Sequence, residues 1–132
     1  MKTTIEIKEQ VAKAYNENSE QIGTVTFEVA EQDGRKLHLI QSADVDAEYQ
    51  RKGLYAAMLK AYAEIQFNGY DCFISIGRSD DAAMFWMKKA GLSEEIAELG
   101  IEKDQQERAL FFNENLELVS NEYSPDYFDL FW

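Results

Sequence analysis

The chain has 132 residues and a formal net charge of −12, from 25 acidic and 13 basic side chains. This length fits one domain, residues 1–132, and the acidity disfavours direct binding to nucleic-acid phosphates. With one cysteine and one histidine, an intrachain disulfide is excluded and a Cys/His metal site is not expected, so we predict a cytoplasmic, reducing environment. No apolar stretch is long enough for a membrane span, and none resembles a secretion signal.

The acidic residues gather toward the C-terminal end. Residues 93–132 hold 11 acids and two bases, whereas residues 1–92 hold 14 acids and 11 bases. Such a surface keeps a protein soluble, and it would also attract cationic partners such as polyamines or lysine-rich proteins. Both interpretations stay open from the sequence.

The N-terminal third is typical of antiparallel strands. Residues 3–7 alternate as a strand does, residues 8–16 fit either a short helix or a strand, and residues 16–19 indicate a turn. Two strands, 22–30 and 36–45, are joined by a hairpin turn at Asp33-Gly34. His38 lies on the second of these strands, where we interpret it as structural or solvated, with a catalytic base as the alternative.

The most informative segment follows, and it reads Val45-Asp-Ala-Glu-Tyr-Gln-Arg-Lys-Gly-Leu-Tyr-Ala-Ala-Met-Leu59. A strand end, a basic turn containing Gly53 and a helix over about 54–67 succeed one another. The first N–H groups of a helix lack intrahelical partners, and the helix dipole adds partial positive charge there. This arrangement predicts a site for a pyrophosphate. The apolar stripe of the helix is predicted to contain Leu54, Met58, Tyr62 and Ile65.

The next elements are a buried strand and a second helix. Residues 71–76 form an apolar run that predicts a parallel strand buried on both faces, with Cys72 as a core residue. A helix over 82–90 follows, with Ser79 or Asp80 as its cap, and it ends at Gly91.

The C-terminal part is predicted in less detail. Residues 93–107 fit a helix or an acidic loop with a short strand, and residues 108–113 and 116–119 predict a hairpin. The last ten residues, 123–132, are strongly aromatic. They are expected either to pack on their own sheet or to form a homodimer contact, since aromatic residues are enriched in interfaces.

The segment around Gly53 resembles the coenzyme A-binding motif of the GNAT acetyltransferase superfamily, which reads roughly V-x-P-E-Y-R-G-K-G-x-G/A. The matching residues are Val45, Glu48, Tyr49, Lys52 and Gly53, and Gln50 takes the first position of the family's Q/R-x-x-G-x-G/A core. Ala47 replaces the usual proline, and Tyr55 replaces the second small residue. The second helix resembles the family's N-x-x-A-x-x-x-Y-x-x-x-G-F motif at Ala83, Gly91 and Leu92, with Asp80 for asparagine and Met87 for tyrosine.

This resemblance implies an α/β (α+β) fold with a mixed, mostly antiparallel sheet, a βαβ coenzyme A-binding unit over about 36–92, and two to three helices. It implies acetyl-CoA as co-substrate and N-acetyl transfer to a primary amine, which the acidic surface suggests is a cationic small molecule or a lysine side chain. The base candidates are Glu28, Asp44 and Asp46. The residues expected to bind the cofactor are Ala43, Val45, Gln50, Arg51, Lys52, Gly53, Leu54, Tyr55, Ala56, Asp80, Ala83 and Met87.

One departure from the family opens a second function class. The family tyrosine commonly protonates the departing thiolate, and methionine at position 87 cannot do so. The alternative is therefore a catalytically degenerate GNAT-fold protein that binds or inhibits a partner through its acidic surface. The N-terminal part is also short relative to the family, which implies an open acceptor groove.

Overall fold

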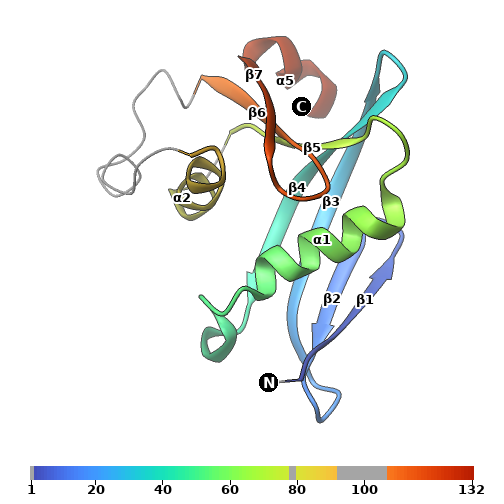
Figure 1. Cartoon of the computed structure of the whole chain (residues 1–132), viewed down its shortest axis with the longest axis vertical. Helices are drawn as coiled ribbons and strands as arrows, with labels where there is room; N and C mark the ends of the chain where they lie inside the picture. The colour runs from blue at the N-terminus through green and yellow to red at the C-terminus, as the bar shows by residue number, and fades with distance from the viewer. Residues whose placement is uncertain (1, 78–79, 92–106) are drawn as a thin grey trace. The chain divides into compact units, whose positions relative to one another are not determined.

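The computed structural model describes residues 2–77, 80–91 and 107–132. The chain divides into two compact units, 1–71 and 72–132. The described part of the chain contains seven strands and three α-helices (Figure 1). All strand pairs within the two units are antiparallel. The predicted α+β class, mostly antiparallel and with two to three helices, is confirmed.

Unit 1 is built on a four-stranded sheet in chain order: β1 (Thr4–Lys8), β2 (Val11–Tyr15), β3 (Gln21–Gln32) and β4 (Arg35–Val45). The open question about residues 8–16 is settled in favour of a strand. The predicted turn between β3 and β4 is confirmed, since Asp33 and Gly34 both have positive φ, 53° and 81°. Two consecutive positive φ angles define the type I′ turn, whose twist suits a tight hairpin.

The helix of unit 1, α1 (Leu54–Gln66), packs against β1, β2 and β3 (Figure 1). Small side chains on the sheet allow this close approach. A Cβ at Gly23 would lie 3.1 Å from the Met58 methyl carbon, and Ala12 and Ala14 are completely buried. The helix buries Leu54, Met58 and Tyr62 as predicted. The prediction for Ile65 is wrong, because this side chain is 65% exposed. Leu59 and Ala63 complete the buried face instead. At about 100° a residue they move the centre of that face towards Tyr62, which leaves Ile65, in the last turn of the helix, at its margin.

Unit 2 contains β5 (Cys72–Ser75), α2 (Asp80–Lys89), β6 (Arg108–Phe112), β7 (Leu118–Tyr123) and α5 (Pro125–Phe131). All four residues of β5 are buried, Cys72 among them. β5 pairs with β6 and β6 with β7, which confirms the predicted C-terminal hairpin. The prediction that β5 runs parallel to β4 concerns both units and stays a prediction.

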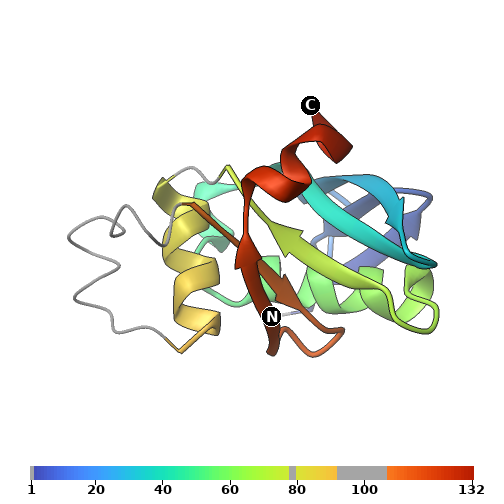
Figure 2. The same cartoon turned by 90° about the horizontal axis from the view of Figure 1, so that it is seen from above.

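The aromatic C-terminal segment packs in part on its own sheet. Figure 2 shows α5 following directly on β7. The Tyr127 ring lies 5.1 Å from that of Phe111 on β6, and its hydroxyl donates to Glu122 at 2.6 Å. Trp132 is 68% exposed nevertheless. The homodimer contact stays an expectation.

The same turn closes two hairpins, one in each unit. Its sequence is Asn-Glu-Asn-x-Glu, at 16–20 and at 113–117. In each turn the first asparagine side chain accepts two backbone N–H bonds, at 2.9 and 3.0 Å. The fourth residue, Ser19 or Leu116, has a positive φ of 63° or 62°. The repeat is absent from our sequence predictions, although its residues recur without change at four of five positions.

Within the described residues, no helix is long and apolar enough to cross a membrane. The same residues contain no group of three or more metal-ligating side chains in a suitable arrangement. The predictions for 93–106, for the Ser79 cap and for Leu92 fall outside the residues that the structure describes.

Candidate functional site

The candidate anion site is the turn between β4 and α1. After β4 the chain makes a short 3-10 turn, Ala47–Tyr49, and then an exposed stretch over 50–53 that leads into α1. Gly53 is the N-cap of α1 and has a left-handed backbone, φ 79° and ψ 6°. Glycine adopts this conformation without a steric penalty, which is why the helix can begin here. No side chain caps this end of the helix.

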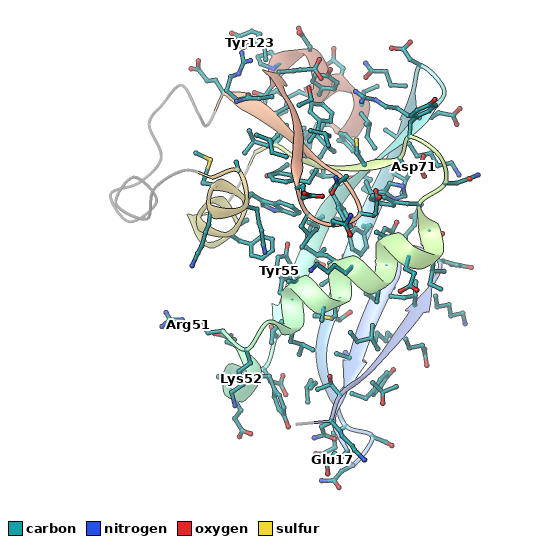
Figure 3. All side chains as sticks on the ribbon, viewed as in Figure 1. Glu17, Arg51, Lys52, Tyr55, Asp71 and Tyr123 are labelled. Atoms are coloured by element: carbon teal, nitrogen blue, oxygen red, sulfur yellow. The ribbon has the colours of Figure 1, made fainter. Side chains whose placement is uncertain are left out.

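Two basic side chains stand next to this helix end. Arg51 and Lys52 are exposed, and Figure 3 shows both on the turn just before α1, with Tyr55 in the first helical turn. Arg51 has a positive φ of 62°, which is unfavourable for a residue with a Cβ. The Lys52 ammonium lies 5.9 Å from the centre of the Tyr49 ring. The first turn of α1 contains no acidic residue. Arg51, Lys52 and the helix dipole therefore favour an anion at this helix end, while the acidic Asp46 and Glu48 belong to the preceding 3-10 turn.

Gln50 fixes the shape of the turn. Its side-chain amide donates to the Val45 carbonyl at 2.8 Å and so ties the turn to the end of β4. Gln50 itself is extended, with φ −68° and ψ 150°. The family resemblance placed Gln50 in the cofactor site, and in the structure its side chain stabilises the turn. The motif alone did not predict the hydrogen bond from Gln50 to Val45.

The C-terminal half of β4 presents backbone groups on the side away from β3. Asp46 N–H donates to Ile22 C=O at 2.9 Å, and Ala43 and Val45 lie opposite Val25 and Gly23 in the register. Because hydrogen-bonded and non-hydrogen-bonded pairs alternate in an antiparallel ladder, Ala43 and Val45 direct their N–H and C=O groups away from β3. These are the two residues expected to bind the pantetheine arm.

A β-bulge separates this half of β4 from the other half. The register passes from Thr26↔Ser42 to Phe27↔Ile40, which leaves Gln41 as an extra residue on β4. Residues 41–44 are exposed, whereas Leu37, His38 and Leu39 are buried. Bulges redirect side chains next to functional sites. Here the bulge separates the buried first half of β4 from its exposed second half.

The three base candidates are exposed and do not converge. Glu28 lies on β3 opposite Leu39, and Asp44 lies on β4 opposite Thr24. Both belong to the sheet face away from α1, about 13 Å apart along the strand at ~3.3 Å a residue. Asp46 precedes the 3-10 turn and makes no side-chain cap bond there.

The remaining cofactor candidates belong to α1 and α2. Leu54 is buried, and Tyr55 and Ala56 are half-buried in the first turn of α1. Asp80 and Ala83 lie on α2. Met87, also on α2, is completely buried.

Sequence reasoning missed one polar cluster of unit 1. His38 Nδ1 lies 2.7 Å from the Tyr62 hydroxyl, and Nε2 lies 3.3 Å from Asp71 Oδ2. Of the two interpretations of His38, structural or solvated, this pairing and its burial support the structural one. The three residues belong to a strand, to a helix and to the segment after that helix. No pattern in the sequence predicts that their side chains come into contact.

Comparisons with known proteins add a likeness among solved structures. No protein-family model and no curated protein matches the sequence. Among solved structures, the chain is similar to the crystal structure of an acetyltransferase from Trypanosoma brucei, with 18% identity and a TM-score of 0.45. The likeness covers 60% of this chain, and the chain spans 60% of the length of that protein.

Proposed function

We propose that this chain is an N-acyltransferase of the GNAT type that takes its acyl group from acetyl-CoA. The observation that carries the proposal is the turn before α1. An uncapped helix N-terminus begins there at a left-handed glycine and stands beside Arg51 and Lys52. Backbone N–H groups, helix dipole and two cations together suit the diphosphate of coenzyme A.

The side of β4 that faces away from β3 supplies the second part of the proposed site. The backbone groups of Ala43 and the N–H of Val45 point away from β3 and would pair with the amides of the pantetheine arm, as an added strand does, while the Val45 carbonyl accepts the Gln50 amide. An N–H near Val45 would then stabilise the oxyanion that forms when an amine attacks the thioester. Glu28, Asp44 and Asp46 remain base candidates, acting directly or through a water molecule.

The proposed acceptor is a primary amine on a cationic small molecule or a lysine side chain. The net charge of −12 supports this choice, because an acidic surface raises the local concentration of cations and repels anions.

A second candidate function is binding without catalysis. Met87 stands where the family has its tyrosine and is completely buried, and a thioether cannot protonate a thiolate. In this version the domain keeps its fold and acts on a partner through its acidic surface. Binding of acetyl-CoA with no transfer to any amine would favour this candidate.

Calorimetric titration with acetyl-CoA tests the proposed cofactor site with a matched pair of variants. Gly53 and Gly69 both have left-handed backbones, φ 79° and 70°, and a Cβ on either one would meet no atom within 4 Å. Valine should therefore strain both positions similarly, by roughly 1–2 kcal/mol. Gly53→Val should abolish binding because its side chain enters the anion site, and Gly69→Val should bind as the wild type does.

The result that contradicts the proposal is equally specific. Wild-type protein that gives no heat and no thermal stabilisation with millimolar acetyl-CoA has no such site. Equal loss of affinity in both glycine variants would mean that the effect is one of stability and not of contact with the diphosphate.

A further inference from the structure

A buried polar cluster of unit 1, formed by His38, Tyr62 and Asp71, has no part in the proposed acyl transfer. His38 is 2%, Tyr62 0% and Asp71 8% exposed. The three side chains come from β4, from α1 and from the segment that follows α1, where Figure 3 shows Asp71. Apolar rings surround them. Phe27 stacks on Tyr62 at 3.6 Å, and Phe67 lies 4.6 Å from the His38 ring.

The hydrogen bonds define the protonation state of the cluster. An ionised carboxylate only accepts, so His38 Nε2–H donates to Asp71, at 3.3 Å. In a neutral imidazole the other nitrogen is then an acceptor, and Nδ1 receives the Tyr62 O–H at 2.7 Å. Neutral His38 therefore satisfies both of its ring nitrogens inside unit 1.

Asp71 also holds the backbone on both sides of the cluster. Its Oδ1 accepts the Lys36 N–H of β4 at 3.1 Å, and its Oδ2 accepts the Asn68 N–H at 3.2 Å. One carboxylate thus ties the segment after α1, residues 67–71, to the beginning of β4. Asp71 is also the last residue of unit 1, so the cluster fixes the place where the chain leaves this unit.

We propose that His38, Tyr62 and Asp71 form a proton-controlled latch, in which neutral His38 holds segment 67–71 against β4 and protonation of His38 releases it. A proton on Nδ1 would face the hydroxyl hydrogen of Tyr62, so that the present bond must reverse or break. It would also place a cation among aromatic rings, which opening of the segment relieves by letting water reach the imidazole.

The charged and titratable groups around His38 act in opposite directions. Burial is the largest influence and lowers the pKa of His38 from 6.5, Asp71 raises it by hydrogen bond and charge, and Lys36 lowers it. Burial raises the pKa of Tyr62, so its hydroxyl keeps its proton. β3 places Val29 opposite His38 and adds no charge.

The sign of the pH effect follows from the lowered pKa. Well above pH 6.5, the ordinary pKa of histidine, His38 is neutral whether the latch is closed or open, and the latch has its full stability. Below 6.5 the open form takes up one proton that the closed form refuses. The opening constant should then rise by up to about tenfold for each pH unit, until the closed form also binds the proton.

Nuclear magnetic resonance can measure this on the full chain, since His38 is the only histidine. The imidazole nitrogen shifts report tautomer and charge, and amide exchange reports opening. We expect the proton on Nε2 at about pH 7.5 and titration below the ordinary histidine value. The protection factors of the Lys36 and Asn68 amides should fall by about tenfold or more between about pH 7.5 and pH 5.

Two variants separate the latch from a general loosening. His38→Gln keeps an N–H donor but cannot be protonated in this range, so its protection factors should not change with pH. Gln66→Ala removes the bond from Gln66 to the Glu9 carbonyl at the same end of α1, and it should leave the pH dependence of the two amides intact.

The wild-type titration decides the question even if a variant does not fold. A proton on Nδ1, titration at or above the ordinary histidine value, or unchanged protection while His38 becomes charged would each overturn the latch. Equal pH dependence in wild type and His38→Gln would overturn it as well. None of these results depends on acetyl-CoA, so the latch and the proposed function stand or fall separately.

Discussion

Asp71 shows how one residue can hold several parts of a unit together. Its carboxylate receives two backbone N–H groups and the His38 ring, and this set of donors compensates for its burial. In the sequence, Asp71 stood out only as the first residue of the apolar run 71–76. Two of its three partners, Lys36 and His38, stand 35 and 33 positions away in the chain, and no local pattern connects residues at such distances.

Removal of the Tyr62 hydroxyl tests the strength of this cluster at the residue scale. Tyr62→Phe keeps the ring that stacks on Phe27 but removes the donor to His38 Nδ1. We expect a loss of about 1–3 kcal/mol in the free energy of unfolding, the cost of leaving a buried polar group without its partner. Urea denaturation at neutral pH measures it.

Tyr70→Phe is the matched control, because Tyr70 is 87% exposed. This change should alter the free energy of unfolding by less than about 0.5 kcal/mol. Equal effects of the two substitutions would mean that the hydrogen bond to His38 contributes nothing to stability.

At the scale of elements, the hairpins and α1 followed from local sequence, and the exceptions have physical causes. Asp33-Gly34 and the alternating residues of β3 and β4 predicted a hairpin that the structure confirms. Residues 11–15 were ambiguous because Ala12 and Ala14 suit a helix, yet both are buried as strand residues under α1. Packing decided the element where propensity did not.

In the two Asn-Glu-Asn-x-Glu turns, we predict that glycine at the fourth position changes the stability of the protein in opposite directions. Ser19 and Leu116 share a left-handed backbone, φ 63° and 62°, where glycine is favoured. Ser19 is exposed, so Ser19→Gly should stabilise the protein by about 0.5–1 kcal/mol through relief of backbone strain. Leu116 is only 2% exposed, so Leu116→Gly should destabilise it by roughly 2–4 kcal/mol through loss of buried surface.

Thermal and chemical denaturation of the two variants provides the measurement. A gain in stability from Leu116→Gly would show that strain exceeds burial in this turn. A loss from Ser19→Gly would show that the left-handed backbone is not maintained in solution.

At the scale of the whole molecule, the sequence predicted the order of elements and the position of the turn before α1. It could not predict the conformation of that turn. The left-handed backbone of Arg51 and the bond from Gln50 to Val45 depend on how β4 ends, which includes the bulge at Gln41. The outward direction of the Ala43 and Val45 backbone also required the register, because a shift of one residue would reverse it.

The net charge of −12 yields a prediction about the acceptor. If a cationic amine is the substrate, attraction by the acidic surface should make kcat/KM fall steeply with added salt, since the Debye length shrinks from about 10 Å at 0.1 M to about 3 Å at 1 M. An assay of thiol release from acetyl-CoA should show polyamines and lysine-rich peptides turning over faster than neutral amines.

A salt-independent rate, or a preference for an uncharged amine, would mean that the acidic surface serves solubility alone. Absence of turnover with every amine, while acetyl-CoA still binds, would favour the second candidate function, binding without catalysis.

The most direct test of the central claim is a titration of the ¹⁵N-labelled protein with acetyl-CoA, followed through the backbone amide signals. We predict the largest shifts at residues 51–57, where the uncapped N-terminus of α1 meets the basic turn, and at Ala43 and Val45, whose backbone groups face away from β3. Unchanged amide signals at these positions at millimolar acetyl-CoA, or shifts confined to other parts of the chain, would contradict the claim that this turn binds the cofactor.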